Sequence, residues 1–259
     1  MRERVLSSFV LVPLVFGAFY LGSVYFGALI LALSLLGAYE YRRMMGLGGI
    51  DLHVSFIPIC AVVALSGYYR PPIFVAALSA GAVLVLSIAL VRSGNAPSAM
   101  YSLSGEMYIG GLLGSLSLLR GGPDGRAWAL FTLLVTWATD VGAYFGGSAL
   151  GKHKMAPAIS PGKSWEGAAC GVASAAAAGA AIGHFADFPA GFGALAGAAL
   201  GVLAELGDLV ESSLKRFAKV KDSGQLIPGH GGALDRFDSL LFTGVGGLLM
   251  RTLHRMVFR

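Results

Sequence analysis

The chain has 259 residues, of which 56% are hydrophobic and only 13% are charged, about half the charged share of a typical soluble domain. Its formal net charge is +5, and the placement of the basic residues is more informative than their sum. This composition excludes a water-soluble globular fold and predicts an all-α, polytopic membrane protein. The two cysteines, Cys60 and Cys170, lie in apolar segments and predict no disulfide framework.

Apolar segments of about 17 to 25 residues, long enough to cross the hydrocarbon as a helix, recur along the whole chain. We predict spans at 5–21, 24–41, 54–69, 72–91, 127–149, 166–186, 190–211 and 238–257. The shorter segment 107–119 would bring the total to about nine. The first segment is similar to a signal peptide, but no small-x-small cleavage site follows it, so we expect a retained helix.

With nine spans and the N-terminus inside, 13 of the 19 lysines and arginines fall in cytoplasmic segments. Cytoplasmic loops carry an excess of Lys and Arg, so this count favours a cytosolic position for the loops 150–165 and 212–236. The C-terminal arginines do not follow the rule. We expect residues 1–105 to form a hydrophobic scaffold or a wall for an acyl chain, and residues 106–259 to form a catalytic region. The expected location is the cell (inner) membrane.

Asp140 lies near the middle of an apolar span, in the sequence WATDVGAYFGG. Acids inside a membrane are rare and usually functional, so we place Asp140 in a candidate site. The alternative is a structural carboxylate bonded to a Tyr, Thr or Arg of another helix.

The segment GKHKMAPAISPGKSWEG, residues 151–167, is basic and leads into the next span. Ser160 and Pro161 predict a helix start, with serine as the N-cap and proline in the first turn. Free N–H groups beside Lys163 and Ser164 would then form an anion site. An ordinary capped helix in a positive loop is the alternative.

Carboxylates gather where the stretch 205–239 leaves one apolar span and enters the next. Glu205, Asp208 and Ser212 share one helical face, and Asp235 and Asp238 are three residues apart. Clustered carboxylates repel one another without a cation, and oxygen-only ligands favour a hard ion, magnesium in particular. The alternative is a salt-bridge network with the nearby basic residues Lys215, Arg216, Lys219 and Lys221.

Between these carboxylates lies Pro228-Gly229-His230-Gly231-Gly232, whose backbone amides could cradle phosphate. The whole run SSLKRFAKVKDSGQLIPGHGGALDRFD resembles, without a gap, the signature of the phosphatidate cytidylyltransferases (CDP-diacylglycerol synthases). The matching residues are Ser212, Lys215, Arg216, Lys221, Asp222, His230, Gly231, Gly232, Asp235, Arg236 and Asp238.

Two further segments resemble the same family, in the expected order. They are WxxDxxAYxxG around Asp140, and SPxKTxEG, which includes Ser160, Lys163 and Glu166. Ser164 stands where the family usually has threonine, and Gly162 where a second lysine is common. The strong resemblance covers about residues 128–240; the first hundred residues match only as hydrophobic spans.

The resemblance implies that the protein joins CTP to phosphatidic acid, giving CDP-diacylglycerol and pyrophosphate, as a homodimer that does not use nucleic acid. Mg²⁺ held by Asp208, Asp235 and Asp238 would bridge the nucleotide phosphates, and a second, monovalent cation is an open expectation. Basic and hydroxyl side chains are the expected phosphate contacts, with Lys215 and Arg236 nearest the chemistry. These contacts are Lys163, Ser164, Lys215, Arg216, Lys221 and Arg236.

Two other functions fit the same acids and lysines on a membrane scaffold. A CTP-dependent lipid kinase would transfer the γ-phosphoryl group and release CDP. An ion-coupled transporter would use Asp140 as a proton or ion site, but it predicts paired half-helices in two repeats, and the sequence shows no such repeat.

Overall fold

The computed structural model describes residues 2–186, 188, 189, 191–224 and 231–258, with side chains from Phe9 onward. Nearly all of this described chain is helical, which confirms the predicted all-α class. The exception is a two-stranded antiparallel hairpin of β1 (Lys154–Ala156) and β2 (Ser160–Ser164), paired through Lys154 with Ser164 and Ala156 with Ser160. The chain forms two compact units, one of Met1–Arg126 and Leu214–Phe237, the other of Ala127–Ser213 and Asp238–Arg259.

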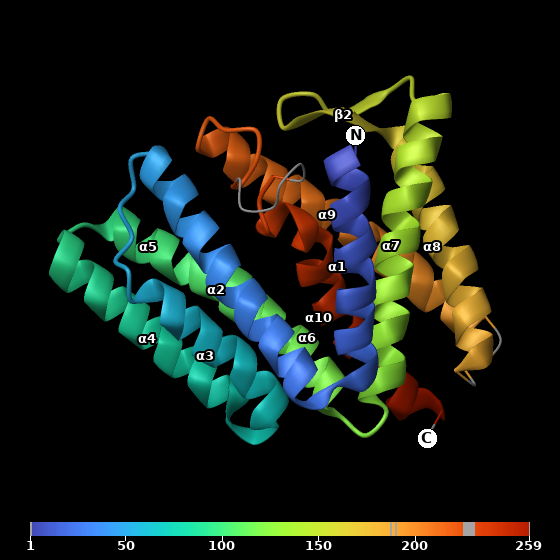
Figure 1. Ribbon diagram of the computed structural model, residues 1–259, viewed down its shortest axis with the longest axis horizontal. Coiled ribbons are helices and arrows are strands. Elements are labelled where there is room, and N and C mark those ends of the chain that lie inside the picture. Colours follow the sequence, from blue (N-terminus) through green and yellow to red (C-terminus); the bar gives the residue numbers. More distant parts are fainter. Residues whose placement is uncertain (1, 187, 190, 225–230, 259) are drawn as a thin grey trace. The chain divides into compact units, whose positions relative to one another are not determined.

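The first unit is a bundle of helices in which α3 packs against α2 and α6, and α4 packs against α5 (Figure 1). Its helices are α1 (Arg2–Leu21), α2 (Ser23–Leu47), α3 (Phe56–Tyr69), α4 (Phe74–Ser93), α5 (Ala96–Gly105) and α6 (Leu112–Gly121), with short 3₁₀ turns at η1 (Pro71–Ile73) and η3 (Leu234–Arg236). The segment Leu214–Phe237, far away in sequence, contributes Phe217, whose ring stacks on Tyr101 of α5 at 5.4 Å.

A π-helical turn, η2 (Glu106–Gly111), joins α5 to α6 without a break. Asn95 caps the start of this helix by accepting a hydrogen bond from the Ser98 N–H at 2.9 Å. The predicted segment 107–119 is therefore the second half of a longer helix that begins at Ala96. It looked too short because the small polar residues of α5 dilute its apolar character.

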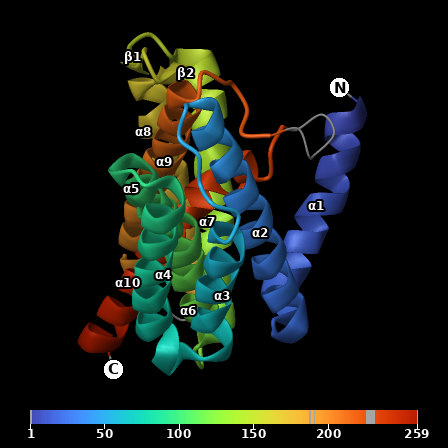
Figure 2. The same cartoon turned by 90° about the vertical axis from the view of Figure 1, so that its left-hand side faces the viewer.

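The second unit contains α7 (Gly125–Leu150), α8 (Trp165–Phe185), α9 (Phe192–Phe217) and α10 (Asp238–Phe258), of which α7 begins and α9 ends in the first unit. Small residues bring α8 and α9 together, as their Ala and Gly content predicts. A Cβ on Gly179 would lie 2.9 Å from the Cα of Gly197, so neither helix has room for a larger residue there. The hairpin lies at one end of α7 and α8 (Figure 2).

Five helices of the described chain are long and apolar enough to cross a membrane: Ser23–Leu47, Pro71–Ser93, Gly125–Leu150, Trp165–Phe185 and Phe192–Phe217. Large apolar side chains such as Val75, Val91 and Phe185 are more than 70% exposed, as expected of helices that face lipid. An all-helical membrane protein therefore fits the structure. The total of about nine spans, and the division between a scaffold before residue 105 and a catalytic region after it, stay predictions.

Candidate functional site

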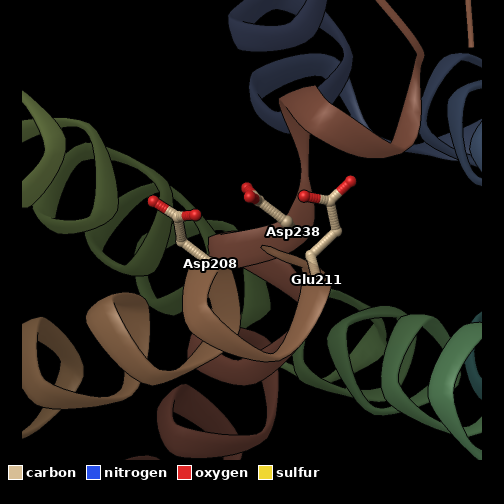
Figure 3. Close-up of side chains that lie close together, drawn as sticks. All are labelled: Asp208, Glu211 and Asp238. Carbon is tan, nitrogen blue, oxygen red and sulfur yellow. The ribbon is translucent and has the colours of Figure 1, made fainter. Parts of the chain in front are cut away.

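Three carboxylates of the second unit meet where α9 passes the first residue of α10. We name Asp208, Glu211 and Asp238 the acidic cluster. Each offers one oxygen, and these oxygens all lie within 4.8 Å of one another. Figure 3 shows the three carboxyl groups on the same side of the two helices. Glu211 is buried, and Asp208 and Asp238 are half-buried, so the cluster concentrates negative charge in a partly desolvated place.

Gly207 allows the two helices to approach closely at this level. A Cβ at this position would lie 2.8 Å from the Asp238 carbonyl oxygen and 3.1 Å from the Ser239 Cα. Asp238 is also the first residue of α10, where the free N–H groups of a helix start favour a carboxylate. Asp238 is thus positioned by the start of α10, and Asp208 and Glu211 lie on one face of α9 because they are three residues apart.

Lys163, at the end of the hairpin, contacts this region from β2. Its Nζ donates to Glu205 Oε2 at 2.6 Å and lies 3.0 Å from Asp208 Oδ2, while Ser212 Oγ donates to Asp208 Oδ1 at 3.2 Å. Burial alone would lower the pKa of Lys163, but the carboxylates of Asp208 and Glu205 outweigh it, so the pKa is raised. Lys163 is therefore a fixed ammonium beside the acidic cluster.

The prediction that Ser160 caps a helix with Pro161 in its first turn is wrong. Residues 160–164 form β2, and Ser164 is the N-cap of α8, its Oγ accepting from the Gly167 N–H at 3.1 Å. Strand pairing with β1 holds Ser160 extended and delays the helix by four residues. Glu166, in the first turn of α8, accepts from the backbone N–H groups of Lys152 and His153 at 3.1 Å and fixes the base of the hairpin.

The first unit contains a second group of charges, in what we name the signature loop: residues 215–224 and 231–236 as described. Asp235 is 8% exposed, and its carboxylate accepts from Lys215 Nζ at 2.7 Å and from the N–H groups of Ser223 and Gly232 at 3.0 and 2.9 Å. Part of the salt-bridge alternative is therefore real, because Asp235 pairs with Lys215. The contact of Asp235 with a metal ion stays a prediction.

The remaining predicted residues are more exposed. Arg216, Lys221, Asp222 and Arg236 have exposed side chains in the signature loop, and Asp140 is exposed on α7. Gly231 has a φ of 82°, a conformation that favours glycine. His230 lies outside the described residues.

Sequence reasoning missed two acids, Glu211 and Glu40. Glu211 could have been found, because it stands three residues after Asp208 on the same helix. No sequence pattern pointed to Glu40 as a site residue, because it lies in the predicted apolar span 24–41, which we assigned to the scaffold. In the structure Glu40 Oε2 accepts from Ser223 Oγ at 2.8 Å, at the signature loop.

Comparisons with known proteins show the family to which the chain belongs. The sequence model that describes the cytidylyltransferase family matches residues 2–253 of this chain. A protein of Pseudomonas aeruginosa named phosphatidate cytidylyltransferase is 36% identical over 257 residues, covering 93% of each chain. Proteins with the same name are 46% identical over 140 residues in Brucella suis, covering 53% of this chain and 52% of theirs, and 41% identical over 146 residues in Staphylococcus aureus, covering 56% and 55%. The family model spans almost the whole chain, and the chain therefore belongs to the cytidylyltransferase family.

Proposed function

We propose that this chain is a membrane enzyme that transfers the cytidylyl group of CTP to phosphatidate, giving CDP-diacylglycerol and pyrophosphate. The observation that carries the proposal is the relationship over 93% of both chains to a protein named for this activity. The acidic cluster and Lys163 in the second unit, and the pair of Lys215 with Asp235 in the first, are of the kind that this chemistry requires and support the proposal.

The reaction requires little proton transfer. An oxygen of the lipid phosphate, already largely ionised at neutral pH, forms a bond to the α-phosphorus of CTP, and the bond from that phosphorus to the β-phosphate oxygen breaks. Pyrophosphate leaves with the electron pair. Two anions must approach each other, so the protein has to supply positive charge and alignment.

The acidic cluster fits a divalent cation. Its three carboxylates offer hard oxygen ligands within 4.8 Å of one another, and magnesium prefers such ligands. We assign Asp208, Glu211 and Asp238 as the residues that would hold Mg²⁺, which would neutralise charge on the nucleotide phosphates. The proposal also includes Asp235 as a ligand of the ion and a second, monovalent cation.

Lysines and arginines of the hairpin and the signature loop are the proposed phosphate contacts. Lys163 and Lys215 are held in place by carboxylates, whereas the side chains of Arg216, Lys221 and Arg236 are exposed to solvent, where a ligand can reach them. We include Ser160, Ser164, Glu166, Ser212, Asp222, His230, Gly231, Gly232 and Asp140 in the proposed substrate site on the strength of their matches to the family pattern.

The finer features of the proposal concern the membrane. We propose about nine spans in the cell (inner) membrane, with the hairpin and the signature loop in the cytosol, where CTP is available. The lipid substrate enters from the bilayer. A homodimer without nucleic acid partners follows the family expectation.

Pyrophosphate release tests the function directly. Purified protein in detergent should release pyrophosphate from CTP only when phosphatidate is present, in equal amounts with CDP-diacylglycerol. The lipid kinase alternative would instead give CDP without pyrophosphate. Neither product would appear for a transporter.

A further inference from the structure

Glu40 is a fully buried carboxylate near the end of α2, a mostly apolar helix whose only other charged residues are Arg42 and Arg43. A buried carboxylate is costly unless hydrogen bonds compensate the lost hydration. Among the described residues, the hydrogen-bond donors to Glu40 come from the signature loop, more than 180 residues away in sequence. A residue of the predicted scaffold is thus joined to the segment that carries the signature.

Both oxygens of Glu40 accept hydrogen bonds. Oε2 accepts from Ser223 Oγ and from the Leu234 N–H, each at 2.8 Å, and Oε1 accepts from the Ala233 N–H at 2.9 Å. Ala233 and Leu234 open the 3₁₀ turn η3, whose first N–H groups have no partner within the turn. Glu40 therefore caps that turn from another helix, because its two oxygens accept from the first backbone N–H groups of the turn.

Two glycines allow the loop to close around this carboxylate. A Cβ on Gly224 would collide with Oε1 of Glu40, and a Cβ on Gly232 would lie 2.6 Å from Oε2. The side chain is thus enclosed from both described arms of the loop. Any larger residue at either position would push the carboxylate away from its donors.

The contacts continue from Glu40 to the charged pair of the loop. Ser223 Oγ lies 3.1 Å from Asp235 Oδ2 as well as 2.8 Å from Glu40, and Asp235 in turn holds the Nζ of Lys215 at 2.7 Å. A displacement of Glu40 would therefore reach Lys215, a proposed phosphate contact, through two side chains.

We propose that Glu40 is a positioning residue for cytidylyl transfer: it fixes the fold of the signature loop and thereby the places of Asp235 and Lys215. It does not touch substrate. The expected effect of Glu40 on the rate of cytidylyl transfer rests on the proposed function. Its effect on the fold of the signature loop does not depend on that function.

The test compares Glu40→Gln with Glu106→Gln in the full-length protein. Glu106 is also fully buried in the first unit, but its carboxylate accepts no hydrogen bond from the described residues, so its neutralisation should leave the loop intact. A glutamine at position 40 keeps the size of the side chain, but its NH₂ group cannot accept from a backbone N–H. We expect a fall in kcat of about tenfold or more, with a smaller change in the KM for phosphatidate.

Limited trypsin digestion gives a readout independent of activity. Lys219 and Lys221 are exposed in the loop, and cleavage after them should accelerate about tenfold in Glu40→Gln at a temperature well below its Tm. Glu106→Gln should be cut at the wild-type rate. If the wild-type protein releases no pyrophosphate, the proposed function fails, while the digestion still decides the role of Glu40 in the loop.

Unchanged kcat and unchanged digestion in Glu40→Gln would overturn the proposal. So would equal acceleration of cleavage in the loop and in the rest of the chain, because that result indicates general destabilisation. If Glu40→Gln does not fold, Gly224→Ala tests the same contact from the loop side. Gly224→Ala should reproduce the fast loop cleavage and the low kcat, and wild-type behaviour in that variant would refute the inference.

Discussion

Lys163 gives the most direct test of the charge arrangement beside the acidic cluster. Its ammonium lies 2.6 Å from Glu205 Oε2 and 3.0 Å from Asp208 Oδ2. At an effective dielectric constant of about 20, each contact corresponds to roughly 6 kcal/mol of Coulomb attraction, most of which is offset by lost hydration. The Glu205 side chain is 8% exposed, so removal of the lysine leaves a poorly hydrated carboxylate without its cation.

We therefore expect Lys163→Gln to lower the free energy of unfolding by about 3 kcal/mol, the lower end of the range for a broken buried pair, because Lys163 and Asp208 keep some contact with solvent. For a chain of this size that corresponds to a fall in Tm of roughly 6 to 12 °C. The raised pKa of Lys163 means that its stabilisation is complete at neutral pH and is lost only as the pH rises through that raised pKa. Activity should also fall, on the order of 100-fold, if the ammonium contacts phosphate.

The assay is thermal unfolding in detergent with EDTA, beside pyrophosphate release with magnesium. Lys152→Gln is the matched control, since Lys152 is exposed on the same segment and its side chain has no ion pair among the described contacts. The double variant Lys163→Gln/Glu205→Gln should recover roughly half or more of the lost stability, because it removes the unpaired charge. A Tm of Lys163→Gln equal to that of Lys152→Gln would refute the reasoning.

Three further predictions follow from the site and the topology. Glu211→Gln removes one ligand of the acidic cluster and should lower turnover on the order of 100-fold, with a weaker rise of Tm on magnesium titration; an unchanged titration would exclude Glu211 from the ion site. Asp140→Asn should lose most activity while staying folded, and near-normal turnover would assign Asp140 a structural role. Single cysteines at Lys154 and Lys219, in a cysteine-free background, should resist an impermeant thiol reagent on intact cells, and labelling from outside would reverse the proposed orientation.

The sequence by itself determined the fold class and the segments that become helices. Lipid cannot hydrogen-bond the backbone, so long apolar segments must form helices, and each predicted span coincides with a helix in the structure. The same local logic found Asp208 and Asp238, because helix spacing and a helix start can be read from neighbouring residues. The signature itself identified the family.

Only the tertiary structure decided which charges meet. The hairpin shows the limit of local reasoning: Ser160-Pro161 is a sound helix start in isolation, but pairing with β1 holds it extended and gives the cap to Ser164. The pairing of Lys163 with Glu205 joins residues 42 apart, and that of Glu40 with Leu234 joins residues 194 apart. Such contacts depend on how separate elements pack, and no local spacing encodes that packing. Glu40 of α2 therefore contacts the signature loop only once the chain is folded.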